Sequence, residues 1–273
     1  SGWYGPAMNT HRSPFAGRNF EYYSEDGVLA GKIAANVVSG AADKGLYAYI
    51  KHFALNDQET FRTEALCTWA DEQTIREIYL KPFEIVVKEA KTTIDYISDE
   101  NGTHSQKEMN GCTAVMSSFN RIGTTWSGGN KALMTDVLRG EWGFKGFAIS
   151  DFNLYDYMNT DQGMRAGTDM QLTWLASDTM PFGRPNYSDT KSGTARQAIR
   201  TAYHNVFYTI ANSNAMQGIA PGTIITYKPS GWRVAFWILD AVLGTFLVCG
   251  TAWVVYRTIK FNSKSKDEES TQN

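Results

Sequence analysis

Alternating strand and helix patterns constrain the fold of this chain more than any other feature. The clearest strand is Gly146–Ile149, a run of small and apolar residues typical of parallel strands that are buried on both faces. The other predicted elements are strands at Pro6–Asn9, Tyr47–Ile50, Thr113–Ser117 and Asp169–Leu172, and helices at Val28–Lys44, Asp71–Ala90, Ala132–Arg139, Leu154–Arg165 and Ala195–Ile210. This alternation indicates an α/β fold, in which helices cover a parallel sheet.

The number of these units indicates how much of a closed barrel is present. About five strand–helix units precede residue 212, whereas a closed (β/α)8 barrel has eight units and ~250 residues. We therefore predict that residues 1–212 form an incomplete TIM barrel, namely about the last five units of a partial (β/α)8 barrel. The chain begins with Ser1 and shows no secretion signal there, so we expect the natural protein to continue upstream.

A long apolar run near the carboxyl terminus predicts a membrane span. Residues 234–256 are apolar apart from Asp240 and a few small residues, and the run reaches the ~20 residues that are needed to cross a bilayer. Lysines and arginines follow it, which marks the cytoplasmic side. We predict a linker at 213–231, a single transmembrane helix at 232–257 and a disordered cytoplasmic tail at 258–273, with the barrel outside the cell. A buried core helix is the alternative.

Composition and motifs exclude several classes of protein. The formal net charge of −2 provides no basic surface, so we predict no nucleic-acid partner. Cys67, Cys112 and Cys249 lack the spacing of metal ligands, and no metal site is predicted. A glycine-rich phosphate loop, a His-Glu-x-x-His motif and a Gly-x-Ser-x-Gly motif are also absent, so no cofactor is predicted.

Several candidate site residues follow predicted strands. Asp151 comes directly after Gly146–Ile149, and Lys51 and His52 follow Tyr47–Ile50. In α/β barrels the carboxyl ends of the strands carry the chemistry, so these side chains should share one mouth. Alternatively, Asp151 caps the next helix, while Lys51 is solvated and His52 is structural.

Arg18 and Phe119 extend this set. Arg18 lies in a loop after the first predicted strand, where its guanidinium group could bind hydroxyls or brace the loop through Glu21 or Glu25. Phe119 follows Thr113–Ser117, and its ring could either pack in the core or face a sugar.

Several separated motifs follow one another along the chain. They are Arg12-Ser13-Pro14, Gly17-Arg18-Asn19-Phe20-Glu21, Ser24-Glu25-Asp26, Lys51-His52-Phe53-Ala54 with Asn56, Glu59 and Arg62, Arg76-Glu77-Ile78-Tyr79-Leu80 with Pro82-Phe83, Leu138-Arg139-Gly140-Glu141-Trp142-Gly143-Phe144, and Gly146 with Ser150-Asp151. In this order they resemble the barrel of glycoside hydrolase family 3, the β-glucosidase family. The resemblance covers about residues 1–210.

The resemblance implies a retaining glycosidase with Asp151 as its catalytic nucleophile and with Arg18, Lys51 and His52 holding the hydroxyls of the sugar. Such an enzyme places a carboxylate ~5 to 5.5 Å from a carboxylic acid that protonates the leaving oxygen. Asp151 must be ionised to attack, and we expect Lys51 or other cations to keep its pKa low.

The chain departs from the family pattern in three ways. Tyrosine is common in relatives where this chain has Phe119, which removes a hydrogen-bond donor beside the nucleophile. The sequence after Lys51-His52-Phe53 differs from the amino-sugar branch, so we expect a neutral β-linked glucoside or xyloside as substrate. No room remains after Asp151 for the α/β domain that carries the acid/base glutamate.

Some family members carry that domain ahead of the barrel, so we expect it and the first barrel strands upstream of Ser1. On this hypothesis the 273 residues alone are inactive or unfolded. A membrane-anchored, non-catalytic sugar-binding protein and a purely structural surface protein remain the alternatives.

Overall fold

The computed structural model describes residues 1–62, 64, 66–153, 157–173, 191–215, 226 and 228–270, with side chains up to 261. Contacts divide the chain into two compact units, Ser1–Gly218 and Ile219–Asn273. Part of the predicted linker, residues 216–225 and 227, and residues 154–156 of a predicted helix lie outside the described residues.

The first unit is built on a parallel sheet of five strands in the order β1-β2-β6-β9-β10. These strands are β1 (Gly2–Trp3), β2 (Tyr47–Phe53), β6 (Ala114–Ser117), β9 (Phe147–Phe152) and β10 (Met170–Leu172). All neighbouring strands are parallel and occur in chain order, as in consecutive strands of a barrel. The prediction of an α/β fold with a parallel sheet is confirmed.

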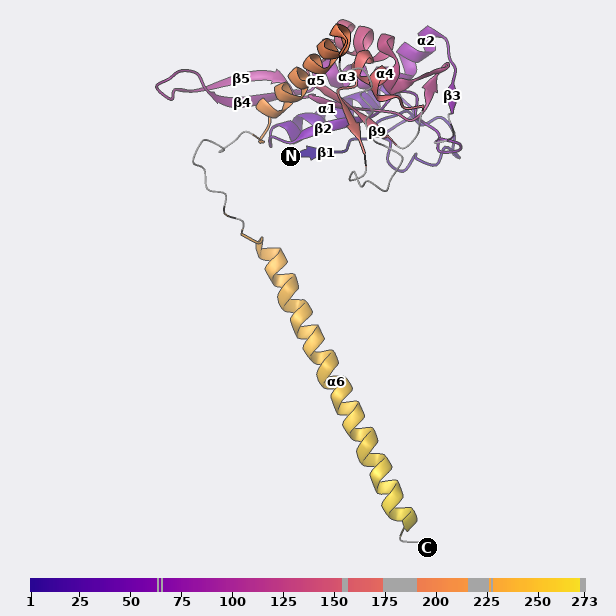
Figure 1. The fold of residues 1–273 in the computed structure, drawn as a ribbon, viewed down its shortest axis with the longest axis vertical. Coiled ribbons are helices and arrows are strands. Elements are labelled where there is room, and N and C mark those ends of the chain that lie inside the picture. The colour runs from indigo at the N-terminus through magenta and orange to yellow at the C-terminus, as the bar shows by residue number, and fades with distance from the viewer. Residues whose placement is uncertain are drawn as a thin grey trace. The chain divides into compact units, whose positions relative to one another are not determined.

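Helices follow the strands around this sheet (Figure 1). They are α1 (Gly27–Ala42), α2 (Glu72–Thr74), η1 (Ile75–Tyr79), α3 (Lys81–Glu89), η2 (Ser127–Gly129), η3 (Ala132–Glu141), α4 (Thr160–Ala166) and α5 (Gly193–Ala211). Asp26 begins α1 by accepting hydrogen bonds from the first-turn N–H groups, and Asn159 does the same for α4.

The main core lies between one face of the sheet and the helices α1, α3 and η3. Phe53 of β2 is fully buried and packs edge-on against Phe83 of α3, with ring centroids 5.2 Å apart, and against Trp142 after η3, at 5.8 Å. Trp142, which follows η3, is therefore part of the core that supports the sheet.

Helix α5 crosses the amino ends of the strands. Asn205 Nδ2 donates to Asp169 Oδ1, just before β10, at 2.9 Å, and Thr209 Oγ1 donates to the Thr113 carbonyl, just before β6, at 2.7 Å. Val206 packs against the second face of the sheet, where Tyr49 and Phe147 lie. The amino ends of β6 and β10 are therefore covered by α5, whereas the carboxyl ends of the strands carry the polar residues described below.

A buried ion pair ties η3 to the amino ends of β9 and β10. Arg139 Nη2 of η3 lies 2.6 Å from Asp169 Oδ2, and Arg139 also donates to the Gly146 carbonyl at 2.8 Å. The same Asp169 oxygen accepts the Ala148 N–H of β9 at 2.8 Å. A buried ion pair is tolerated only when its remaining polar atoms are hydrogen bonded, and this carboxylate meets that condition.

Three elements differ from the sequence predictions. The helix predicted at Leu154–Arg165 begins only at Thr160, because residues 157–159 are not helical and Asn159 caps α4. The single helix predicted at Asp71–Ala90 is divided into α2, a π-helical turn η1 and α3, although Asp71 begins it as expected. The predicted strand at Pro6–Asn9 contributes only an isolated bridge between Ala7 and Lys51, and the regular strand β1 lies earlier.

An antiparallel ribbon, β4 (Lys91–Ile97) paired with β5 (His104–Asn110), was not predicted. It is inserted between α3 and β6 and extends beyond the other strands (Figure 1). A smaller sheet is formed by β3 (Cys67–Thr68), β7 (Arg121–Ile122) and β8 (Thr125–Trp126).

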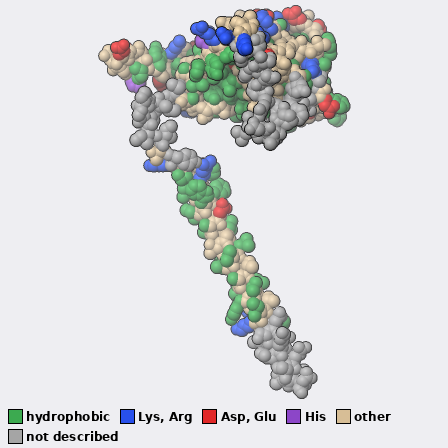
Figure 2. Space-filling model, viewed as in Figure 1, with side chains coloured by type: hydrophobic (Ala, Val, Ile, Leu, Met, Phe, Trp, Pro, Cys, Tyr) green, Lys and Arg blue, Asp and Glu red, His purple; other side chains and the backbone are tan. Residues whose placement is uncertain are grey.

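In the described part of the second unit there is one helix, α6 (Gly231–Ser270). Its segment Gly231–Phe261 is long and apolar enough to cross a membrane, with a mean hydropathy of 1.9. Exposed hydrophobic side chains are spread along this segment (Figure 2). The helical backbone continues to Ser270, into the segment for which the sequence predicted a disordered tail.

Gly146, at the start of β9, is expected to tolerate no side chain. A Cβ atom there would lie 2.0 Å from the Thr113 carbonyl oxygen. We expect Gly146→Ala to destabilise the first unit by about 1–3 kcal/mol, because overpacking forces the backbone to shift. Urea unfolding measures this, with Gly140→Ala as the matched control, since its Cβ would meet nothing closer than 3.6 Å. Equal stability of the two variants would contradict the packing described here.

Candidate active site

Polar residues gather at the carboxyl ends of the strands, where the connecting loops meet. Lys51 and His52 lie in the last residues of β2, and Asp151 lies near the end of β9. Arg18 comes from the loop between β1 and α1, and Phe119 from the segment after β6. This is the edge that carries the chemistry in barrel enzymes.

Asp151 is the buried carboxylate of this site, with a side chain only 6% exposed. Its Oδ1 accepts the backbone N–H of Phe152 at 2.8 Å. Its Oδ2 faces two nitrogen atoms, Arg62 Nη2 at 3.3 Å and His52 Nε2 at 3.6 Å. The carboxylate is thus held in place by contacts on both oxygens.

Burial raises the pKa of Asp151 above its ordinary value, although the Phe152 N–H and the cations Arg62, Arg18 and Lys51 pull it down. The prediction that cations would keep this pKa low is therefore wrong for the protein without bound sugar. Desolvation outweighs them, and Arg62, not Lys51, is the strongest of the cationic influences.

Arg62 is the site residue that the sequence analysis did not single out, although it belongs to the motif Asn56, Glu59 and Arg62. Its Nη1 lies 3.1 Å from both carboxylate oxygens of Glu59, while Nη2 reaches Asp151. Its guanidinium group also lies over the ring of Phe119, 4.6 Å from the centroid. The sequence signal that could have revealed Arg62 was its position three residues after Glu59, because a carboxylate at this spacing can orient an arginine.

Arg18 is buried and is held by two carboxylates. Its Nε donates to Glu21 and lies 3.3 Å from Glu59 Oε1, and its Nη2 lies 3.4 Å from His52 Nε2. Lys51 Nζ lies 3.9 Å from the other oxygen of Glu21. Alternating cations and carboxylates therefore connect Arg18, Lys51 and Arg62.

His52 is fixed by its backbone and kept neutral by its surroundings. Its N–H donates to Asn9 Oδ1 at 2.9 Å, and its carbonyl accepts Asn9 Nδ2 at 3.0 Å. Burial, followed by the charges of Arg18, Lys51 and Arg62, holds the pKa of the imidazole well below its ordinary value. A neutral imidazole can donate one hydrogen bond and accept another.

Several buried polar atoms of this site have no hydrogen-bond partner within the described part of the chain. They are Arg18 Nη1, His52 Nδ1, Arg62 Nε and both amide atoms of Asn56. Leaving a buried polar group unpaired costs about 1–3 kcal/mol, so such atoms are rare unless a ligand or water satisfies them. These atoms show that hydrogen bonding within the cluster is incomplete among the described residues.

The structure brings all five predicted site residues into one cluster. Asp151, His52 and Arg18 form a chain of contacts, Lys51 joins it through Glu21, and Phe119 joins it through Arg62. Phe119 is buried beside Trp126 and Met158. The roles assigned to these residues in binding a sugar stay predictions.

This arrangement suits nucleophilic attack within a ring of hydrogen-bond donors. Asp151 supplies one carboxylate, while Glu21 and Glu59 are engaged by the cations. In the described residues, no group of three or more His, Cys, Asp or Glu side chains is placed to hold a metal ion. The groups that these side chains themselves offer are carboxylates and fixed hydrogen-bond donors.

The chain belongs to glycosyl hydrolase family 3, since the model of the family's N-terminal domain matches residues 3–97 and 103–182. The family resemblance inferred from the motifs is thus confirmed.

Curated relatives are β-glucosidases that are much longer than this chain. β-Glucosidase B of Emericella nidulans is 40% identical over 167 residues, which cover 61% of this chain and 17% of that protein. The β-glucosidase of Rhizobium radiobacter is 39% identical over 167 residues, covering 61% of this chain and 18% of the relative. The chain thus spans less than a fifth of their length.

Solved structures show the same similarity. β-Glucosidase 3B from Thermotoga neapolitana in complex with glycerol superposes with a TM-score of 0.64 at 33% identity, covering 78% of this chain and 28% of that one. A complex of the same enzyme with glucose gives a TM-score of 0.60 at 32% identity, with 78% and 27% covered.

Proposed function

We propose that this chain is the catalytic barrel part of a retaining β-glucosidase that removes terminal β-linked glucose, or xylose, through a covalent glycosyl-Asp151 intermediate. The observation that carries this proposal is the buried Asp151 carboxylate, which Arg62 and His52 hold beside polar atoms that have no partner. The β-glucosidase relatives support the reaction class.

In the first step Asp151 attacks the anomeric carbon, and the leaving oxygen takes a proton from a carboxylic acid. Arg18, Lys51 and His52 would bind the sugar hydroxyls and orient the ring for this attack. Water then breaks the glycosyl-Asp151 bond, activated by the same acid after it has lost its proton. Retention of configuration follows from the two successive inversions.

We infer that the acid is a glutamate on an α/β domain upstream of Ser1, together with the first strands of the barrel. Glu21 is ion-paired with Arg18, and Glu59 is ion-paired with Arg62. These pairs support the inference, because an ion-paired carboxylate stays ionised and is poorly suited to donate a proton. We also propose that α6 anchors the protein in the cell membrane as a single span, with the barrel outside and the carboxyl terminus in the cytoplasm.

The complete protein is expected to hydrolyse an aryl β-glucoside with retention. Proton NMR of the sugar released in the first minutes should show the β-anomer. Residues 1–228 alone should be inactive, because the acid is missing. An α-anomer as first product, or full activity of residues 1–228, would contradict the mechanism or the domain order, respectively.

A non-catalytic sugar-binding protein is the second candidate. Phe119 favours it, since a phenyl ring offers no hydroxyl to the nucleophile. Binding of glucose to the complete protein without any hydrolysis would support this candidate.

A further inference from the structure

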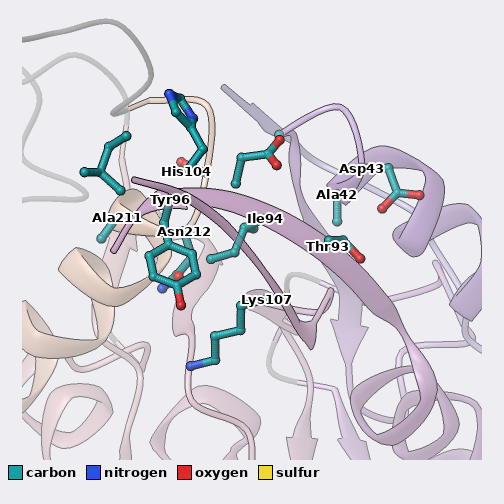
Figure 3. A pocket seen from close by; sticks show the side chains of 13 residues that line it. Ala42, Asp43, Thr93, Ile94, Tyr96, His104, Lys107, Ala211 and Asn212 are labelled. Carbon is teal, nitrogen blue, oxygen red and sulfur yellow. The ribbon is translucent and has the colours of Figure 1, made fainter. Parts of the chain in front are cut away.

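The β4–β5 ribbon borders a hollow that lies away from Asp151. The hollow has a volume of about 760 Å³ and is bounded by the ribbon, the turn after α1 and the end of α5 (Figure 3). We call it the hairpin cleft and define it by Asp43, Ile94, Tyr96, Lys107, Asn212 and Ser213. Cavities of ~300–1,000 Å³ are typical of small-ligand sites.

The hairpin cleft lies at the amino ends of the strands. It includes Gly45, which precedes β2, whereas Asp151 lies near the carboxyl end of β9. The two sites are therefore on opposite edges of the sheet, and a ligand in the cleft cannot reach the nucleophile.

One face of the ribbon supplies an apolar platform. Side chains alternate between the faces of a strand, and Ile94 is paired with Lys107, so Ile94, Tyr96 and Lys107 share one face. Figure 3 shows these three side chains on one side of the ribbon and His104 on the other. Tyr96 as a whole residue is 43% exposed, so an aromatic side chain is available on this face.

Hydrogen-bonding groups surround this platform. Asp43 Oδ1 accepts the Thr92 hydroxyl at 2.9 Å, and within the described part of the chain no hydrogen bond reaches Asp43 Oδ2. Asn212 uses its amide nitrogen, which donates to the Tyr208 carbonyl at 2.7 Å. Lys107 forms no ion pair with any described residue, so its ammonium group can donate to a ligand.

We propose that the hairpin cleft is a non-catalytic binding site for a neutral oligosaccharide chain. A sugar ring has an apolar face, which suits Tyr96 and Ile94, and a rim of hydroxyls, which suits carboxylate, amide and ammonium groups. Charges of both signs line the cleft, which disfavours a strongly anionic or cationic ligand. The choice of a β-glucan as this oligosaccharide rests on the proposed function.

The ribbon is also where the chain interrupts the family pattern. The family model leaves residues 98–102 unmatched, and these residues form the turn between β4 and β5. The ribbon residues that line the hairpin cleft lie in the matched segments on either side of this gap, so the departure from the family model is confined to the turn.

The test is native affinity electrophoresis of the detergent-solubilised complete protein in gels that contain laminarin or barley β-glucan, with dextran as an α-linked comparison. The Asp151→Asn background prevents digestion of the polymer. Tyr96→Ala removes the aromatic surface and Lys107→Ala removes the ammonium donor. Each substitution should therefore weaken the retardation of the protein in these gels about fivefold or more. Tyr203→Ala is the matched control, because Tyr203 is 61% exposed on α5 and does not line the cleft.

The same substitutions made with Asp151 intact should leave hydrolysis of a small aryl β-glucoside unchanged. Absence of retardation in the parent protein, or equal retardation of Tyr96→Ala and parent, would overturn the proposal. If retardation depends on Tyr96 but the complete protein has no glycosidase activity, the proposed function is refuted, whereas the proposal that the hairpin cleft binds an oligosaccharide still holds. Unchanged melting temperatures verify that the variants are folded.

Discussion

Asp151→Asn is expected to reduce aryl β-glucoside hydrolysis by the complete protein at least about 1,000-fold. The amide has nearly the same shape as the carboxylate but cannot form the glycosyl ester, so the covalent step is lost. Initial rates with a chromogenic glucoside measure the effect. Residual activity near that of the parent would exclude Asp151 as the nucleophile.

Stability provides the control for this variant. Burial raises the pKa of Asp151, so the folded state binds this proton more tightly than the unfolded state does. Ionisation of Asp151 therefore costs stability as the pH rises from the unfolded pKa through the folded pKa, and asparagine removes that cost. The variant should melt at neutral pH no lower than the parent, which separates loss of chemistry from loss of fold.

Arg62→Met is expected to lower kcat/KM about 100-fold. It should also move the acidic limb of the pH profile of kcat/KM to higher pH. The methionine keeps an unbranched side chain over Phe119 but removes the cation that lies 3.3 Å from Asp151. Without this charge the already raised pKa of Asp151 should rise further, so a larger fraction of the enzyme is protonated and inactive at a given acidic pH. A pH profile of kcat/KM measures both effects.

Arg76→Met is the matched control, because it removes the same charge from a surface pair with Glu72 and Glu141. Its acidic limb should coincide with that of the parent. An Arg62→Met enzyme with reduced activity but an unshifted limb would show that Arg62 binds substrate without acting on the nucleophile.

The buried strands and their carboxyl-end residues could be predicted from sequence. Gly146–Ile149 is apolar throughout, and its place before Asp151 follows from the rule that parallel strands end at one edge. The same rule predicted that Lys51 and His52 lie at that edge. The direction of the Asp151 pKa shift could not be predicted, because it depends on how completely the carboxylate loses water.

Other features depended on contacts between distant residues. Arg62 lies 89 residues from Asp151 in the chain, and only folding brings them together. The β4–β5 ribbon is largely exposed and mixes polar with apolar residues, so no buried face marked its strands. The division at Leu80 in the predicted Asp71–Ala90 helix reflects a local π-helical turn that apolar spacing does not reveal.

The ion pair between Arg139 and Asp169 lies at the opposite edge of the sheet from the nucleophile. Substitutions that strengthen or weaken this pair should change heat resistance without changing substrate preference, and loop substitutions near Asp151 should do the reverse. A directed-evolution programme could therefore select thermal tolerance and specificity in separate libraries. The selected substitutions could then be combined, because those of one library should have little effect on the property selected in the other.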